Sequence, residues 1–166
     1  MNPKQLSHEL REETGPDLNR RRWIVGLSMV GAAMGAIVTL YQTGIVEHLP
    51  DPPIEVFNSD KVDASTYAYK RLNSPDGPMM LINYGVTALL ASMGGKKRGE
   101  NNSWVPIALL IKSLFDTGLA LELAREEWKE NKALCAYCQT ATLASIATAS
   151  LAAPEAIKAF RSLSDA

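Results

Sequence analysis

The sequence predicts an all-α protein, a four-helix transmembrane bundle with a long extracytoplasmic loop after the first span. Three stretches without a charged residue lead to this prediction: residues 23–46, 77–95 and 133–154, of 24, 19 and 22 residues. About 20 helical residues cross a hydrocarbon core of about 30 Å, so each stretch is long enough for one span. Small residues are frequent in them, as at Gly31 and Gly35, and small residues let membrane helices approach closely.

A further span is predicted over residues 103–123, although this stretch contains Lys112, Asp116 and Glu122. Lys112 and Asp116 are four residues apart, so they share one face of a helix and can form an ion pair. Ionisable side chains at membrane depth normally face the bundle interior. The helix is expected to continue beyond the membrane through residues 125–129.

The alternative for all these segments is a soluble four-helix bundle. Against it, residues 23–46, 77–95 and 133–154 show no polar stripe of the kind that an amphipathic soluble helix carries. Composition excludes other classes of protein. The chain has 17 basic and 18 acidic residues, no basic excess for binding nucleic acid, and 46% hydrophobic content excludes a disordered chain.

The basic residues predict the orientation. Compact clusters at residues 20–22 and 96–98 adjoin span ends, where the positive-inside bias acts. We therefore expect a multi-pass protein of the cell inner (cytoplasmic) membrane with both termini in the cytoplasm. The expected parts are an N-terminal tail over residues 1–22, a membrane domain over 23–155 and a C-terminal tail over 156–166. The start of the chain does not read as a cleavable signal peptide, because its charged region is too long.

The outer loop spans residues 47–76 and contains Pro50, Pro52 and Pro53. A short helix is predicted in it over residues 63–71, with Asp63 or Ser65 as its cap. Because the chain is expected to span a membrane, membrane lipid is one expected partner. Nucleic acid is not an expected partner, because the chain has no excess of basic residues.

The chain's two cysteines, Cys135 and Cys138, stand three apart at the outer end of the last span. At a helix N-terminus, unpaired N–H groups and the helix dipole would stabilise a thiolate. The spacing puts both sulfurs on one face, so a disulfide can form with little backbone change. These features favour a redox-active centre, with two small apolar residues of no function as the alternative.

Metal and haem sites are not expected. A zinc site needs four ligands, and the remaining candidates are His8 and His48, of which His8 is predicted on the opposite side of the membrane. Haem attachment needs a histidine directly after the second cysteine, where this chain has Gln139.

With its Cys-x-x-Cys opening the fourth span, the chain resembles the vitamin K epoxide reductase family over about residues 22–155. The string over residues 133–140, Ala-Leu-Cys-Ala-Tyr-Cys-Gln-Thr, is close to bacterial members. The family also has a loop pattern Cys-x-x-Val-x-x-Ser, which Val62 and Ser65 fit, with Tyr67 following. Ser59 stands where the family has its second loop cysteine, and the first would fall near Asp51, so the loop cysteine pair is absent.

The resemblance implies roles for the remaining residues. In the family, the loop pair takes electrons from a thiol partner and passes them to the membrane pair, which reduces a quinone. Cys138 would then be the sulfur next to the quinone, and Cys135 the sulfur that exchanges with the partner. Asn83 and Thr142 are the quinone-binding candidates: the family uses an Asn near this span, and Thr142 stands where it has a Tyr. Tyr137 is interpreted as an interfacial aromatic residue.

Two functions follow from this resemblance. The first is a membrane thiol–disulfide oxidoreductase that uses ubiquinone or menaquinone as a substrate and a thioredoxin-like extracytoplasmic thiol protein as a partner. The second is a catalytically degenerate relative, a structural or assembly subunit of a larger membrane complex. A transporter has little support, because four spans with one inward Lys–Asp pair show no pathway.

Overall fold

The computed structural model describes residues 2–70 and 73–164, and the regular structure in those ranges is helical without a strand. The all-α prediction is therefore confirmed. In chain order the elements are α1 (Pro3–Glu12), α2 (Pro16–Gln42), α3 (Ser59–Asp63), η1 (Thr66–Tyr69), α4 (Asp76–Ser92), α5 (Arg98–Asn101), α6 (Trp104–Asn131) and α7 (Ala136–Ser164).

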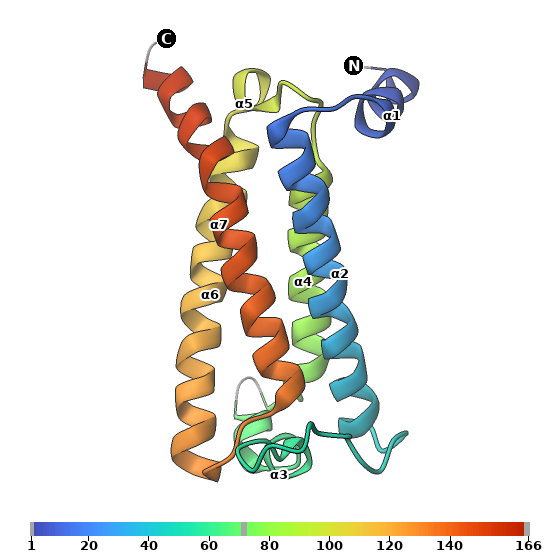
Figure 1. Ribbon diagram of the computed structural model, residues 1–166, viewed down its shortest axis with the longest axis vertical. Coiled ribbons are helices and arrows are strands. Elements are labelled where there is room, and N and C mark those ends of the chain that lie inside the picture. Colours follow the sequence, from blue (N-terminus) through green and yellow to red (C-terminus); the bar gives the residue numbers. More distant parts are fainter. Residues whose placement is uncertain (1, 71–72, 165–166) are drawn as a thin grey trace.

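Four long helices, α2, α4, α6 and α7, run along the long axis of the molecule (Figure 1). Helix α2 packs against α4 and α7, and α6 packs against α7. Both termini lie at one end of this bundle, and α3 lies at the other end with the start of α7 (Figure 1). The continuation of the third predicted span through residues 125–129 is confirmed, since α6 ends at Asn131.

Small residues bring α2 and α4 together, as the sequence predicts. A Cβ atom at Gly35 would lie 2.9 Å from the backbone nitrogen of Leu81, and one at Gly77 would lie 2.7 Å from that of Thr39. Neither position has room for a side chain. The two helix backbones are therefore in direct contact along this seam.

Among the described residues, α2 is the one helix that could cross a membrane by the criteria of length and apolar composition. Only 28% of its apolar window is buried, unlike the core helix of a soluble protein. Helix α4 is shorter, with 17 residues. Large apolar side chains also face outward on α4, α6 and α7, for example Ile82, Phe115 and Leu143. The arrangement with four spans remains a prediction.

The outer loop is folded more tightly than the sequence predicts. Instead of one helix over residues 63–71, α3 ends at Asp63 and η1 follows from Thr66, while residue 71 lies outside the described residues. Asn58 caps α3 by accepting a hydrogen bond from the N–H of Lys61 at 3.0 Å, and Ser65 is the cap position of η1. The predicted bounds of this helix were wrong, because a run of polar residues in the sequence does not show where the chain turns.

The loop is fastened to the segment before α7. Helix α6 ends at Asn131, and the next residue, Lys132, has a φ of 52° in the left-handed region, which reverses the chain. The N–H of Leu134 then donates to the carbonyl of Val56 at 2.9 Å, and the N–H of Asn58 donates to the carbonyl of Leu134 at 3.0 Å. These bonds set the loop directly over the start of α7.

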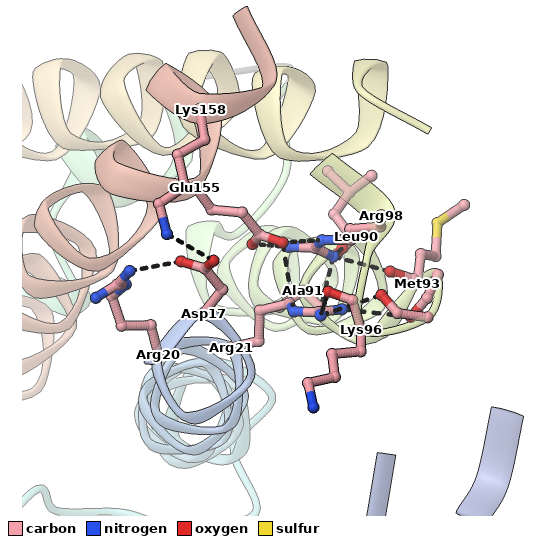
Figure 2. Close-up of polar contacts among 12 residues, drawn as sticks. Asp17, Arg20, Arg21, Leu90, Ala91, Met93, Lys96, Arg98, Glu155 and Lys158 are labelled. Carbon is pink, nitrogen blue, oxygen red and sulfur yellow. Dashed lines mark hydrogen bonds and ion pairs between the residues drawn. The ribbon is translucent and has the colours of Figure 1, made fainter. Parts of the chain in front are cut away.

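An ionic cluster closes the opposite end of the bundle. Arg98 is fully buried and its Nε and Nη2 donate to the two carboxylate oxygens of Glu155 at 2.9 and 2.8 Å. Arg21 lies 3.5 Å from the same carboxylate (Figure 2). One carboxylate on α7 thus holds α2 and α5 in place.

Candidate redox site at the Cys-x-x-Cys motif

The two cysteines open α7. Cys135 is the last residue before the helix and is fully buried, while Cys138, in the first turn, is half-buried. The N–H of Cys138 donates to Sγ of Cys135 at 3.1 Å, so the two sulfur-bearing residues are in direct contact. The predicted position of the pair at a helix N-terminus is confirmed.

The surroundings of the Cys135 sulfur act on a thiolate in two opposite ways. The N–H of Cys138 donates to this sulfur at 3.1 Å, which favours the charged form. Complete burial, and a carboxylate oxygen of Asp63 within 4.8 Å, disfavour it. Stabilisation of a thiolate by the helix N-terminus therefore stays a prediction.

Two buried carboxyls flank the pair, and sequence reasoning missed both. Oδ1 of Asp63, at the end of α3, lies 3.9 Å from Sγ of Cys138. Oε2 of Glu127 accepts hydrogen bonds from the N–H of Cys135 at 3.3 Å and from Nε2 of Gln139 at 3.1 Å. Glu127 stands beyond the predicted third span. Burial raises the pKa of each carboxyl to about 7, from 3.8 for Asp63 and 4.5 for Glu127.

The two loop positions without cysteine are joined to each other. Oγ of Ser59 donates to Oδ1 of Asp51 at 2.6 Å, and the N–H of Ser59 donates to Oδ2 of Asp51 at 2.7 Å. Oγ of Ser59 also accepts the N–H of Ala136, between the two cysteines, at 3.0 Å. The Asp51–Ser59 pair thus ties the loop to the site through Ser59. No local pattern predicts the bond between Ser59 and Ala136, because the two residues are 77 positions apart.

The other motif residues support the cysteines. Val62 is buried in the same apolar cluster as Cys135. The hydroxyl of Ser65 donates to the carbonyl of Val62 at 2.6 Å and holds the turn after α3. Tyr137 is interpreted from the sequence as an interfacial residue, and its hydroxyl donates to the carbonyl of Pro50 at 2.8 Å, a second tie between the loop and α7.

A cavity of about 210 Å³ adjoins the pair, and its lining includes Cys138, Asn83 and Thr142. Glu127, Tyr84 and Asp116 also line it. Cys135 and Asp63 do not border the cavity. The structure therefore brings the quinone-binding candidates to the same space as one sulfur, with apolar side chains making up most of the wall, as is usual for sites that hold small organic molecules.

The polar side chains of the cavity are already partly engaged. Nζ of Lys112 donates to Oδ1 of Asn83 at 2.9 Å and to Oγ1 of Thr87 at 2.7 Å, and it pairs with Asp116 as predicted from their spacing. Since the oxygen of Asn83 is occupied, its NH₂ group is the part that can donate to a ligand carbonyl. Oγ1 of Thr142 donates to the carbonyl of Cys138 at 2.9 Å. The lone pairs of this hydroxyl oxygen can therefore still accept a hydrogen bond from a ligand.

A metal ion fits this site less well than a redox couple. Donor atoms of Asp63, Cys135 and Cys138 lie within 4.8 Å of one another. The carboxylate of Asp63 is a possible ligand in addition to the cysteines and histidines considered from the sequence. Three donors in the described part of the chain are one fewer than a structural zinc site takes. His48 lies against Asp60 instead, at 2.5 Å.

Comparison with protein families gives one match. The model of the vitamin K epoxide reductase family matches residues 22–153, which include the loop, the cavity and both cysteines. Searches of curated proteins and of solved structures found no match.

Proposed function

The chain belongs to the vitamin K epoxide reductase family, and on this basis we propose that it couples a disulfide between Cys135 and Cys138 to the reduction of a quinone in a membrane. Family membership supports the general activity, a membrane thiol–disulfide oxidoreductase. The quinone is the finer part of the proposal. The observation that carries it is the cavity that Cys138 shares with Asn83 and Thr142.

The proposed reaction has two halves. A thiolate of the partner attacks Cys135, the disulfide opens, and the partner's second thiol resolves the mixed disulfide, which leaves both cysteines reduced. The dithiol then gives two electrons and the disulfide reforms, while the quinone takes two electrons and two protons. Cys138 acts at the cavity, where Asn83 can donate to a quinone carbonyl.

The missing loop cysteines change how the partner must act. In place of a loop disulfide, Asp51 and Ser59 are hydrogen-bonded, and this link cannot carry electrons. A thioredoxin-like extracytoplasmic protein would therefore deliver electrons directly to Cys135. Because Cys135 is fully buried, this exchange requires the loop to move aside.

The proposed location is the inner membrane with both termini in the cytoplasm. Family membership and the apolar helix α2 indicate membrane association. Both termini lie at the same end of the bundle as α5, and the start of α7 lies at the other end (Figure 1). The two cysteines lie at the start of α7. This arrangement supports an extracytoplasmic position for the cysteines under the positive-inside bias.

Thiol trapping in intact cells tests the function. In the wild-type chain, quinone depletion should leave the cysteine pair reduced, because the disulfide can no longer be regenerated. Cys135→Ser should abolish exchange with the partner, and Cys138→Ser should abolish quinone reduction. Thr140→Ser, an exposed position on the same helix, serves as the control and should behave as wild type.

A structural or assembly subunit of a larger membrane complex is the second candidate. The Asp51–Ser59 link favours it, because a loop fastened by hydrogen bonds needs no redox partner. This candidate requires copurification in stoichiometric amounts with a complex whose assembly survives the Cys135→Ser and Cys138→Ser double change. A cysteine pair whose redox state does not change on quinone depletion would also support this second candidate.

A further inference from the structure

Asp63 is an unusual buried acid. It is 1% exposed, and its Oδ2 atom has no hydrogen-bond partner among the residues that the structure describes. An ionised carboxylate buried without partners is expensive, so such a group tends to hold a proton or to serve chemistry. Its other oxygen, Oδ1, lies 3.9 Å from Sγ of Cys138, which is within reach of a thiol hydrogen bond.

The surroundings of Asp63 disfavour its charged form. The titratable groups that act on it or respond to it are acids, thiols and phenols rather than cations in the part of the chain that the structure describes. They come from α2, the outer loop, α4, α6 and the start of α7: Tyr41, Asp51, Asp60, Asp76, Glu127, Cys135, Tyr137 and Cys138. Burial is the largest cause that raises the pKa of Asp63, to about 7, which is close to the working pH of a cell.

The proton on Asp63 depends on the state of the cysteines. In the dithiol, a thiol S–H can donate to the carboxylate, and hydrogen bonding to a charged form favours that form. In the disulfide there is no S–H, so the same buried carboxylate loses that donor. Opening and closing the disulfide should therefore move a proton off and onto Asp63.

We propose that Asp63 is the acid–base residue of the Cys135–Cys138 couple, giving a proton to Cys138 when the disulfide opens and taking it back when it closes. This inference rests on the proposed function and deepens it. When the partner's thiolate attacks Cys135, the S–S bond breaks and Cys138 leaves as a thiolate that takes the proton of Asp63. General acid–base catalysis of this kind contributes about 10²–10⁴-fold to a rate.

The protons and electrons balance over one turnover. The partner's dithiol loses two electrons and two protons and becomes a disulfide. On reoxidation, the two S–H bonds of the cysteines break, one S–S bond forms and the quinone receives both electrons. The proton of Cys138 returns to Asp63, and the proton of Cys135 goes to the quinol. The quinol takes its second proton from solvent, which had received the proton of the attacking partner thiol. Asp63 ends protonated, as it began.

A redox titration of the purified full chain against dithiothreitol tests the proposal without any quinone. Oxidation of an ordinary dithiol releases two protons, as does that of dithiothreitol, so the exchange equilibrium is independent of pH below the thiol pKa values. If Asp63 takes up one proton on oxidation, the ratio of oxidised to reduced chain should fall as pH rises above about 7, by up to tenfold per pH unit. Asp63→Asn should make the equilibrium independent of pH, and Asp63→Glu should restore part of the slope.

Glu130→Gln is the matched control, because it removes an exposed carboxylate on α6 that pairs with Lys70 at 3.0 Å. It should keep the wild-type slope. Thermal unfolding of Asp63→Asn checks that this variant is folded. If it is unfolded, the pH dependence of Asp63→Glu is compared with that of Glu130→Gln instead.

The results separate the two claims. Equal, pH-independent equilibria in wild type and Asp63→Asn would overturn the role of Asp63, even if the chain reduces quinone. If the equilibrium of the wild type depends on pH, Asp63→Asn abolishes that dependence and the chain never reduces quinone, the role of Asp63 is upheld and quinone is rejected as the electron acceptor. One tightly bound zinc per chain, lost in Asp63→Asn, would also overturn the proposal, since the carboxylate would then hold a metal instead of a proton.

Discussion

At the scale of single residues, the site is governed by groups that have lost their water. Asp63 and Glu127 are 1% and 3% exposed, and Cys135 is 0% exposed. Burial is the largest cause that raises the pKa of the two carboxyls. A proton bound by these two carboxyls near neutral pH is therefore a property of the folded chain and is absent from the unfolded one.

The raised carboxyl pKa values predict how stability depends on pH. Between the unfolded pKa values of 3.8 and 4.5 and the folded values of about 7, the folded chain binds more protons than the unfolded chain. Stability should therefore fall as pH rises through that window and level off above it. In detergent, the melting temperature should be higher at pH 5 than at pH 8.

The same measurement on Asp63→Asn isolates one of the two groups. The amide cannot ionise, so the difference between pH 5 and pH 8 should shrink relative to wild type. Glu130→Gln, which removes an exposed carboxylate, should leave the difference unchanged. Identical melting of wild type at the two pH values would contradict the shifted carboxyls.

At the scale of elements, the bundle depends on backbone contact between α2 and α4. Gly35 faces the backbone of Leu81, and Gly31 faces the ring of Tyr84, whose hydroxyl bonds to Ser145 of α7 at 2.7 Å. Tyr84 also lines the cavity beside Cys138. A change in the distance between α2 and α4 would therefore affect the candidate quinone site through the side chain of Tyr84.

We predict that Gly35→Ala destabilises the chain by about 1–3 kcal/mol, the usual cost of forcing extra atoms into a packed contact. The new Cβ would lie 2.9 Å from the backbone nitrogen of Leu81, which cannot move aside cheaply. Gly26→Ala on the same helix is the matched control, because its Cβ would meet nothing within 4 Å. It should be neutral or stabilising by up to about 1 kcal/mol, the helix propensity of alanine over glycine.

Denaturant or thermal unfolding in detergent measures both variants. A Gly35→Ala chain that unfolds like Gly26→Ala would show that the seam between α2 and α4 opens easily. Loss of quinone-linked activity in Gly35→Ala at an unchanged fold would connect the seam to the cavity through Tyr84.

At the scale of the whole molecule, the two ends of the bundle are held in different ways. The cysteine end is tied by the loop, and the end with the termini is tied by Glu155, which contacts Arg98 and Arg21 (Figure 2). Nη1 of Arg98 also donates to the carbonyls of Leu90, Ala91 and Met93, at the end of α4. This one guanidinium therefore joins α4, α5 and α7.

Arg98→Met should destabilise the chain by about 3–5 kcal/mol, because Glu155 and several carbonyls would lose a buried partner. Thermal unfolding in detergent measures the effect. Lys158→Ala removes an exposed ion pair with Asp17 at the same end, and it should cost less than about 1 kcal/mol. Equal melting of the two variants would contradict the cluster's role, and Arg98→Met with Glu155→Leu should recover part of the loss.

Local features of the sequence were sufficient for much of the architecture. The helical runs, the small-residue face of α2, the Lys112–Asp116 pair and the position of Cys135 before α7 follow from residues close together in the chain. That α4 is the helix lying against this face was not predicted. The family resemblance, later matched over residues 22–153, depended on the same kind of local motif.

The sequence by itself determined the helices and the cysteine pair at a helix start, because hydrogen bonding and side-chain spacing within a helix act over a few residues. Only the tertiary structure decided that Asp63 and Glu127 are buried beside the pair, that Asp51 and Ser59 bind each other, and that Asn83 and Thr142 share a cavity with Cys138. These contacts join segments up to dozens of residues apart. Their energies come from desolvation and packing, which are set by the whole fold.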